Sequence, residues 1–166
     1  MSVQWDSDVD VVVVGSGAAG LSAAVSAAEA GLSVRLLEKA PLLGGTTAVG
    51  GGGIWIPGNP HMREMGLDDD RDEAIAYALS TTGGHEPDPA LVAVYVDKAL
   101  EATAFLEATT PAEFFVAEVF SDYYLAHTGS RRLGRTLDNR PYPARDELGE
   151  WDARIRRTPH YPPLTL

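Results

Sequence analysis

The chain has 166 residues, of which 45% are hydrophobic, and this is enough for one domain with a packed core. Its formal net charge of −11 disfavours electrostatic attraction to nucleic acid or to anionic membranes. The absence of Cys excludes disulfides, thiolate metal sites and a Cys nucleophile within these residues. We therefore expect a cytoplasmic protein that has no nucleic-acid partner and no metal.

An uncharged run from residue 11 to residue 28 is long enough to be mistaken for a membrane span. The run contains three Gly and three Ser, and acidic residues precede it. Signal peptides begin with basic residues, and membrane helices are more uniformly apolar than this run. We therefore predict a soluble protein with no membrane span.

A glycine-rich turn follows the first predicted strand. Residues 11–14 are four valines, which predict a short strand buried on both faces, as in a parallel sheet. The turn Gly15-Ser16-Gly17-Ala18-Ala19-Gly20 has the spacing of a dinucleotide-binding motif. Gly15 permits the tight turn, Gly17 lets the backbone approach a pyrophosphate, and Gly20 lets the next helix pack on the strand. The pyrophosphate would accept hydrogen bonds from N–H groups at the helix N-terminus.

A helix and a second strand complete this unit. The helix is predicted over residues 21–30, with Gly31 just beyond its end, and the strand over residues 32–37. The strand carries Glu38 to the carboxyl edge of the sheet, where a carboxylate can accept hydrogen bonds from both ribose hydroxyls and would repel a 2′-phosphate. We include the adjacent Lys39 among the cofactor-binding candidates. The alternative is a glycine-rich turn that binds no nucleotide.

A second glycine-rich segment follows, with six glycines between Gly44 and Gly53. Glycine loses much backbone freedom on folding, so this density implies a compensating gain. A flexible linker is one interpretation. We favour a loop whose bare backbone lies against a flat aromatic ligand, because the segment contains paired hydroxyls and leads directly into the apolar residues 54–57.

The remaining chain predicts packing elements. Helices are expected over residues 70–82 and 88–109, the second opened by Asp88 and Pro89. The second helix is expected to bury a stripe of apolar side chains: Leu91, Val92, Val96, Leu100, Phe105 and Leu106. A third strand is predicted over residues 113–120, and an irregular segment from residue 121. We therefore expect an α/β fold with a Rossmann-like βαβ unit and a parallel sheet, and place a domain boundary between residues 1–120 and 121–166.

The block from Gly44 to Pro57, GGTTAVGGGGIWIP, resembles the fumarate reductase/succinate dehydrogenase-type flavoproteins. Among them it is most similar to the 3-ketosteroid 1-dehydrogenases, which carry a GGTSA-like motif followed by GGGIW[IL]P. Residues 121–124 (SDYY) and 134–136 (GRT) are similar to the DYY and GR[ST] segments of that family. The resemblance covers nearly the whole chain, and these enzymes desaturate the bond between carbons 1 and 2 of a 3-ketosteroid.

This resemblance implies that FAD is the cofactor. Residues 15–20 would lie at the pyrophosphate and Glu38 at the adenosine ribose. A second set would reach toward the isoalloxazine: Gly44, Gly45, Thr46, Thr47, Ala48, Gly51, Gly52 and Gly53. Relatives with covalent flavin attach it through a His near this block, and residues 44–53 contain none. We therefore expect non-covalent FAD.

The resemblance also implies a catalytic role for Tyr123. In the steroid enzymes a matching Tyr supports a second tyrosine, which removes a proton from carbon 2 while the flavin accepts hydride from carbon 1. An adjacent phenol can tune the pKa of such a base through a hydrogen bond. From the residues alone, Tyr123 and Tyr124 are also consistent with amphipathic side chains at the boundary of a strand.

Two polar groups have weaker interpretations. Arg131, Arg132 and Arg135 form a basic cluster that could recognise an anionic substrate, as in dicarboxylate reductases, but we favour a solvated loop. The four histidines have no metal-ligand spacing and are expected in surface or loop positions: His61, His85, His127 and His160.

The family resemblance implies a longer protein whose flavin domain is discontinuous, so we expect this chain to be an N-terminal portion. The proton-abstracting tyrosine and the groups that polarise the ketone would lie outside it, and we expect no turnover from the 166 residues alone. An unpaired strand edge and self-association are expected. Three functions remain open: a dehydrogenase of an apolar small molecule such as a steroid, a reductase of an unsaturated dicarboxylate, and a non-catalytic flavin-binding remnant. The electron acceptor is not predicted.

Overall fold

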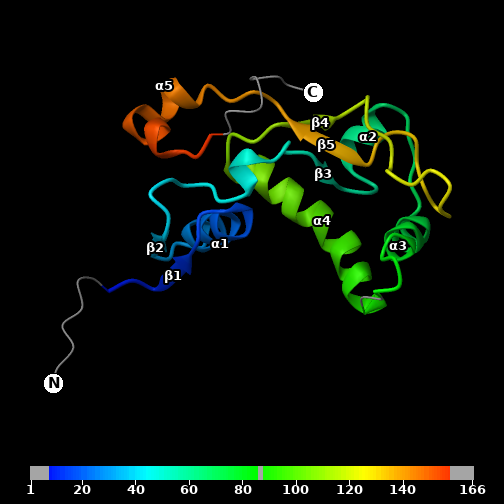
Figure 1. The fold of residues 1–166 in the computed structure, drawn as a ribbon, viewed down its shortest axis with the longest axis horizontal. Helices are drawn as coiled ribbons and strands as arrows, with labels where there is room; N and C mark the ends of the chain where they lie inside the picture. The colour runs from blue at the N-terminus through cyan, green and yellow to red at the C-terminus, as the bar shows by residue number, and fades with distance from the viewer. Residues whose placement is uncertain (1–7, 86–87, 158–166) are drawn as a thin grey trace. The chain divides into compact units, whose positions relative to one another are not determined.

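The computed structural model describes residues 8–85 and 88–157. Within these residues the chain forms two compact units, one made of residues 8–51 and 143–157 and the other of residues 52–142 (Figure 1). The first unit contains both predicted cofactor-binding motifs up to Gly51. The boundary predicted at residue 120, between the N-terminal part of an FAD-binding domain and an irregular segment, stays a prediction.

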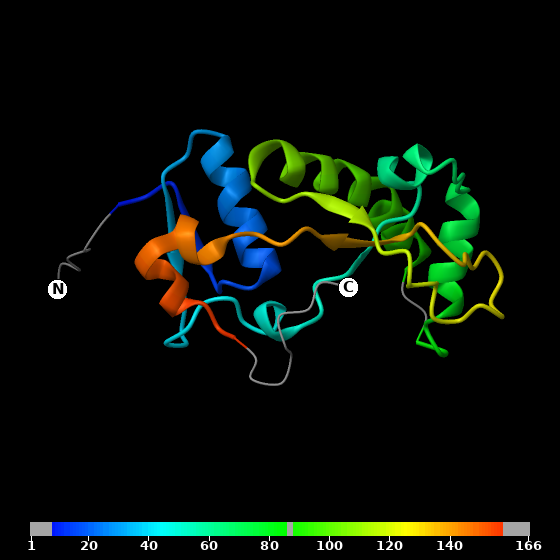
Figure 2. The same ribbon diagram turned by 90° about the horizontal axis from the view of Figure 1, so that it is seen from above.

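The first unit is built around a βαβ element. Strand β1 (Val11–Val14) and strand β2 (Val34–Leu37) run parallel with Val11 opposite Val34, and helix α1 (Ala18–Glu29) connects them. Both ribbon views show α1 alongside this strand pair (Figures 1 and 2). Asp10 and Ser33 fix the start of the pairing, because the Asp10 carboxylate accepts hydrogen bonds from both N–H and O–H of Ser33. The predicted α/β class and parallel pair are confirmed.

The burial of β1 differs from the prediction. Val13 faces α1 and is 7% exposed, whereas Val12 is 56% exposed and Val14 81% exposed. Alternate strand residues point to opposite faces, so Val12 and Val14 share the face that α1 does not cover. The expected burial on both faces is therefore wrong for these described residues, because β1 has a hydrogen-bonded neighbour on one side and a helix on one face.

The remaining elements of the first unit come from residues 42–51 and from residues 143–157, and the two segments are hydrogen-bonded to each other. A 3₁₀ turn (Thr47–Val49) lies in the second glycine-rich segment, and helix α5 (Ala144–Leu148) leads into a second 3₁₀ helix (Gly149–Arg154). Leu43 pairs with Ile155 in a parallel bridge, with hydrogen bonds of 2.8 Å from Leu43 N to Arg154 O and from Arg156 N to Leu43 O. The sequence predicted neither α5 nor this bridge.

The second unit contains an antiparallel sheet of order β3-β5-β4: Ile54–Trp55, Thr136–Asn139 and Phe114–Val116. The third strand predicted over residues 113–120 is therefore shorter, because the chain turns where Phe120 N donates to Ala117 O. Strand β5 was not predicted. It contains Asp138 and Asn139, residue types that are depleted in strands, and pairing on both sides compensates.

Three helices pack with this sheet: α2 (Pro60–Glu64), α3 (Arg71–Ser80) and α4 (Pro89–Thr109). The cap predicted at Asp88 is confirmed, because its side chain accepts a hydrogen bond from Ala90 N, and Asp70 caps α3 in the same way by accepting from Glu73 N. The predicted stripe of α4 is only partly correct. Its buried residues are Val96, Ala99 and Thr103, and Leu91 is 66% exposed.

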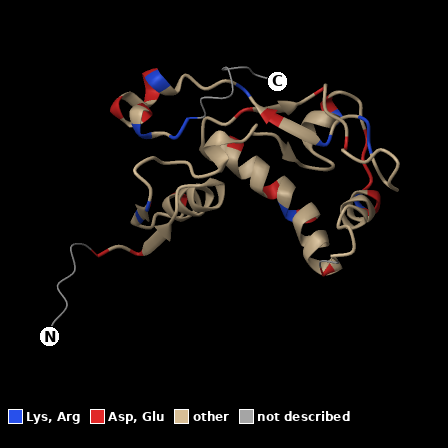
Figure 3. Ribbon diagram, in the orientation of Figure 1, with Lys and Arg blue, Asp and Glu red and all other residues tan. Residues whose placement is uncertain are grey.

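The core of the second unit is a cluster of Ile56, Met62, Ala99, Val116 and Leu137. Helix α4 carries four charged residues, Asp97, Lys98, Glu101 and Glu107, whereas α1 in the other unit carries a single one, Glu29 (Figure 3). No helix within residues 8–85 and 88–157 has both the length and the apolar composition that a bilayer crossing requires.

Candidate functional site

The predicted phosphate-binding turn has the geometry that its glycines imply. Gly15 adopts φ +97°, which favours glycine. A Cβ at Gly20 would lie 1.9 Å from the carbonyl oxygen of Gly15, so α1 lies directly against the turn. The roles predicted for Gly15 in the turn and Gly20 in the close packing are therefore confirmed.

The N-terminus of α1 presents backbone N–H groups beside this turn. Gly17 is the N-cap residue and makes no side-chain capping hydrogen bond. Among the described side chains, the one that reaches the first turn of α1 is Thr47, whose Oγ1 accepts a hydrogen bond of 3.0 Å from Ala18 N. A helix N-terminus with free N–H groups favours an anion through both hydrogen bonds and the helix dipole.

Ser16 connects three segments of the site. Its hydroxyl donates to Glu38 Oε2 over 2.6 Å and accepts from Gly44 N over 2.8 Å, and its backbone N–H also donates to Glu38 Oε2 over 2.9 Å. The Ser16 side chain is fully buried. This single hydroxyl therefore joins the turn after β1, the acid after β2 and the second glycine-rich segment.

Glu38 lies at the carboxyl end of β2, as predicted. Its Oε1 accepts a hydrogen bond of 2.8 Å from Ala40 N, in addition to the two bonds that Ser16 donates to Oε2. The N–H group of Ala40 and then the hydroxyl and N–H of Ser16 lower the pKa of Glu38 from 4.5 to about 2. Both acceptor positions of Oε2 are in use, and Oε1 keeps one position free for a ligand hydroxyl.

The second glycine-rich segment lies against the phosphate-binding turn. A Cβ at Gly45 would be 3.7 Å from the Cα of Gly17, and a Cβ at Gly44 would be 2.4 Å from the Cβ of Ala48. Together with the hydrogen bonds from Ala18 N to Thr47 and from Gly44 N to Ser16, these contacts bring residues 44–48 to the N-terminus of α1. The contact between Thr47 and the helix was not predicted, because no local pattern relates residues 29 positions apart.

Other predicted cofactor-binding residues are not brought to this cluster. Lys39 is exposed beside Glu38, and Gly51 is exposed at the end of the first unit. Gly52 and Gly53 belong to the second unit, where Cβ atoms at these positions would approach Asp138 and Thr136 of β5. Their roles toward a cofactor stay predictions.

The residues present fit a dinucleotide such as FAD. A close-packed turn and an N-terminus without a side-chain cap at Gly17 suit the pyrophosphate, and a carboxylate with a free acceptor position suits a ribose hydroxyl. The donors are neutral backbone groups in a chain of net charge −11, which matches recognition by oriented dipoles more than by cationic side chains.

The second unit holds the predicted catalytic residue. Tyr123 lies in the loop after β4 and its side chain is 88% exposed. Beside it, Asp122 is buried and accepts hydrogen bonds from Trp55 Nε1, Arg131 N and Arg135 Nη1. Tyr123 therefore has an exposed phenol and follows a residue whose carboxylate is buried, and its catalytic role stays a prediction.

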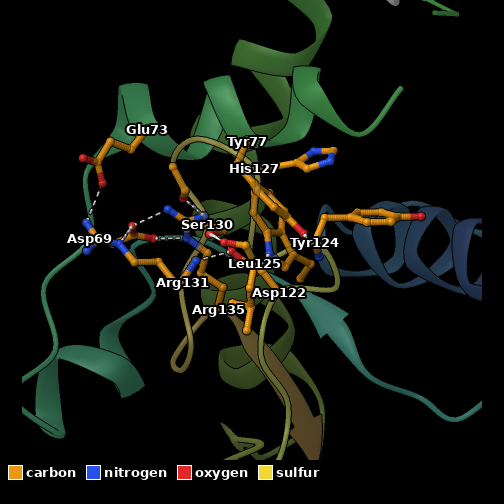
Figure 4. A network of polar contacts seen from close by, with 12 residues as sticks. Asp69, Glu73, Tyr77, Asp122, Tyr124, Leu125, His127, Ser130, Arg131 and Arg135 are labelled. Atoms are coloured by element: carbon orange, nitrogen blue, oxygen red, sulfur yellow. Dashed lines mark hydrogen bonds and ion pairs between the residues drawn. The ribbon is translucent and has the colours of Figure 1, made fainter. Parts of the chain in front are cut away.

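The arginine cluster is largely committed to internal contacts. Arg135 is buried, with a bidentate contact to Asp69 of 2.8 and 2.7 Å and a third contact of 2.9 Å to Asp122 (Figure 4). Arg131 pairs with Asp69 and Glu73, and Arg132 is exposed. The favoured interpretation of a solvated loop is therefore wrong for Arg135, whose charge is neutralised inside the unit.

Sequence reasoning missed Asp69 as the partner of Arg135. Burial raises the pKa of Asp69, but the hydrogen bonds and the positive charge of Arg135 outweigh it and hold that pKa below its usual value. The residue stands in a run of three Asp at positions 68–70, which reads as a solvated acidic stretch. No spacing rule connects residue 69 to residue 135, so this pairing had no local signal.

Two of the histidines make polar contacts of their own. His61 Nε2 lies 3.0 Å from Glu107 Oε1, and His127 Nδ1 lies 2.9 Å from Ser80 Oγ. His85 is exposed in a loop, and His160 lies outside the described residues.

The chain matches the family model described as an FAD binding domain over residues 10–161. It is 41% identical over 145 residues to a 3-oxosteroid 1-dehydrogenase of Mycobacterium tuberculosis, a match that covers 87% of this chain and 25% of the relative. It is also 41% identical over 150 residues to a 4-oxocyclohexanecarboxylate 2-dehydrogenase of Sinomonas cyclohexanicum, covering 90% of this chain and 26% of the relative. The chain thus spans about a quarter of the length of these curated relatives.

The chain is also similar in structure to solved flavoproteins. A 3-ketosteroid delta1-dehydrogenase from Sterolibacterium denitrificans superposes with a TM-score of 0.82 at 35% identity, covering 90% of this chain and 26% of that one. A flavocytochrome c3 fumarate reductase superposes with a TM-score of 0.62 at 25% identity, with the same coverage. The predicted resemblance to steroid dehydrogenases and fumarate reductases is confirmed, and the chain belongs to the FAD-binding-domain family of flavoproteins.

Proposed function

We propose that this chain is the FAD-binding part of a dehydrogenase that removes two hydrogens from adjacent carbons of a 3-ketosteroid. The observation that carries the proposal is the joint at Ser16, where the phosphate-binding turn, Glu38 and residues 44–48 meet. Relatives named 3-oxosteroid and 4-oxocyclohexanecarboxylate dehydrogenases support the substrate class, because both names specify an oxo compound and its dehydrogenation.

In this proposal the first unit holds the cofactor. The N–H groups at the start of α1 donate to the pyrophosphate, and the free acceptor position of Glu38 Oε1 takes one hydroxyl of the adenosine ribose. Thr47 Oγ1 accepts from Ala18 N and so places the backbone of residues 44–48 on the same side as the phosphates. A bound flavin supplies the acceptor for a hydride from carbon 1 of the steroid.

Tyr123 has the second role in the proposal. Its exposed hydroxyl would donate a hydrogen bond to the base that removes a proton from carbon 2, and so favour the ionised form of that base. Reduction of an unsaturated dicarboxylate is the other candidate, supported by the similarity to a fumarate reductase. It receives no support from Arg135, because that side chain donates four hydrogen bonds inside the unit.

The cofactor is tested by titrating the purified chain with FAD, ADP and NADP and following binding by calorimetry and flavin absorbance. We expect FAD to bind, NADP to bind more weakly, and acid precipitation to release the flavin. Glu38→Ala is expected to weaken FAD binding, whereas Glu29→Ala at the far end of α1 leaves it unchanged. The cofactor assignment is contradicted if the folded chain does not bind FAD, or if Glu38→Ala and Glu29→Ala bind FAD with equal affinity.

The reaction is tested with an androstenone and an artificial electron acceptor, and separately with fumarate and a reduced dye. In a longer form of this protein that desaturates the steroid, Tyr123→Phe is expected to lower kcat by about 100-fold or more, the typical contribution of proton-transfer catalysis. Tyr142→Phe is the matched control, since Tyr142 is also exposed. In that longer form, turnover of fumarate in place of the steroid favours the reductase, and turnover of neither favours a flavin-binding remnant, whereas the 166 residues alone are expected to turn over neither substrate.

A further inference from the structure

We propose that Asp122 is a positioning residue, which acts through a buried ion network with Arg135 and Asp69 to hold the backbone of Tyr123 in one place. The proposal rests on the role proposed above for Tyr123. It explains how the exposed Tyr123 side chain can be held in a fixed position by the buried residue before it.

Asp122 is fixed by its side chain and by its backbone. Its Oδ1 accepts from Trp55 Nε1 over 2.7 Å, and its Oδ2 accepts from Arg131 N over 2.7 Å and from Arg135 Nη1 over 2.9 Å. Its own N–H donates to Arg131 O over 3.0 Å. The residue immediately before Tyr123 therefore takes part in four hydrogen bonds, three of them in a site with little access to water.

The residue after Tyr123 is also held. Tyr124 N donates to the hydroxyl of Tyr77 on α3 over 3.2 Å, and the Tyr124 ring stacks on His127. Further along the loop, a Cβ at Gly129 would lie 2.1 Å from the carbonyl oxygen of Glu73, so the loop lies directly on α3. Tyr123 thus stands between two anchored neighbours while its own side chain is 88% exposed.

The network behind Asp122 is fully satisfied. Arg135 and its two carboxylate partners each have about 1% of the side chain exposed. The guanidinium lies 5.5 Å from the ring centroid of Trp55 and 5.8 Å from that of Tyr77, and it also donates to Gly129 O. Every buried side-chain nitrogen and oxygen in the described residues has a hydrogen-bond partner. Figure 4 shows Arg135 between the two carboxylates, with the loop of residues 122–131 around it.

The chemistry of this network favours positioning over plain stabilisation. Apolar side chains of similar volume often stabilise a core as well as a buried ion pair does, because the charges must be desolvated. The ion pairs add a fixed geometry, since a bidentate guanidinium donates its hydrogen bonds to carboxylates in one arrangement. Here the fixed position of the Asp122 carboxylate restricts the backbone of Tyr123, the next residue in the chain.

The test measures backbone order in the 166-residue chain by ¹⁵N relaxation, which does not depend on turnover. The Tyr123 amide is expected to be ordered, with an order parameter near about 0.85, as in rigid backbone. Asp122→Asn places an amide N–H₂ or a neutral oxygen where the carboxylate met Arg131 N and Arg135. The Tyr123 order parameter is expected to fall below about 0.6, the flexible range, while α4 amides keep their values.

Asp138→Asn is the matched control, because Asp138 is a buried carboxylate on β5 that accepts from Asn139 N and not from the network. It is expected to leave the Tyr123 amide ordered even where it lowers stability. A mobile Tyr123 in the unaltered chain, or an equal response to both substitutions, overturns the proposal.

Tyr77→Phe provides a milder second variant, should Asp122→Asn fail to fold. It removes the hydroxyl that anchors Tyr124 N and keeps the ring beside Arg135, so increased mobility is expected at residue 124 while Tyr123 stays ordered. Loss of order at Tyr123 in a folded Tyr77→Phe chain would assign its ordering to the Tyr77 contact and contradicts the proposal for Asp122. If Tyr123 is held as described but Tyr123→Phe leaves turnover intact, the catalytic role fails and the positioning stands.

Discussion

At the scale of single residues, the joint at Ser16 shows how one buried hydroxyl can organise a ligand site. Two sequence-distant partners, Glu38 and Gly44, use the donor and an acceptor position of the same oxygen. The sequence predicted Ser16 as one of the residues at the pyrophosphate and gave its hydroxyl no separate role. Its hydroxyl chemistry became evident once the turn brought it to both partners.

Ser16→Ala is expected to lower the free energy of unfolding by about 1–3 kcal/mol, because Gly44 N and Glu38 Oε2 lose a buried partner. FAD binding is expected to weaken as well, since residues 44–48 lose one of their attachments to the phosphate-binding turn. Urea unfolding and calorimetry measure the two effects. Ser26→Ala on the exposed face of α1 is the control, and an equal loss in both variants would refute the joint.

The pKa of Glu38 gives a pH prediction. The folded-state value of about 2 lies below the ordinary 4.5, so this carboxylate contributes stability that is complete above pH 4.5 and is lost as the pH falls toward 2. Glu38→Gln is expected to remove this part of the acid sensitivity. Urea unfolding measured between those pH values checks it, with the exposed Glu64→Gln as control. The same pH dependence in Glu38→Gln and in the unaltered chain would exclude the Ser16 and Ala40 bonds as its cause.

At the scale of elements, the approach of α1 to β1 determines where the helix N–H groups point. Gly20 is the contact that permits this approach, because any Cβ would meet the backbone of Gly15. The clasp between Asp10 and Ser33 sets the register of β1 against β2 at the other end of the strands. These contacts place Glu38 at the same edge of the pair as the turn.

Gly20→Ala is expected to destabilise the chain by about 1–3 kcal/mol, the range for a methyl group forced into a packed site, and to weaken FAD binding by moving α1. Thermal unfolding and FAD titration provide the measurements. Gly51→Ala is the matched control for thermal unfolding, because a Cβ at Gly51 meets nothing within 4 Å. If the Gly20→Ala chain has an unchanged free energy of unfolding, close contact between α1 and the turn is not required for stability.

At the scale of the whole molecule, the uncovered face of β1 is the main departure from a stable parallel sheet. Val12, Val14 and Leu37 are all half or more exposed on a strand pair that no further strand extends within residues 8–85 and 88–157. Parallel strands are normally covered on both faces, and exposed apolar strands promote association. The isolated chain is therefore expected to self-associate as its concentration rises.

Val14→Lys is expected to reduce this self-association, because it places a charge in the centre of the apolar face. Sedimentation velocity over a concentration series measures it. Val119→Lys is the control, since Val119 is equally exposed, at 78%, but lies outside every strand. Equal effects of the two substitutions would attribute the association to general hydrophobicity instead of this face.

The capped helices were predictable because their signals are local. The Asp70 and Asp88 caps and the glycine turn at residues 15–20 depend on neighbours within a few positions. Strand β5 and the pairing of Leu43 with Ile155 were not predictable, because partners far along the chain create them. The burial of β1 was wrongly predicted for the same reason, since exposure depends on what covers a face.

By itself the sequence determined the βαβ unit, its glycine turn, the acid after β2 and the family, because each is encoded by residue type at short spacing. Tertiary structure alone decided that Ser16 joins Glu38 to Gly44, that Thr47 meets α1, and that Arg135 is neutralised by Asp69 and Asp122. The physical reason is that hydrogen bonds and ion pairs depend on distance in space, and folding brings together residues that local patterns do not relate.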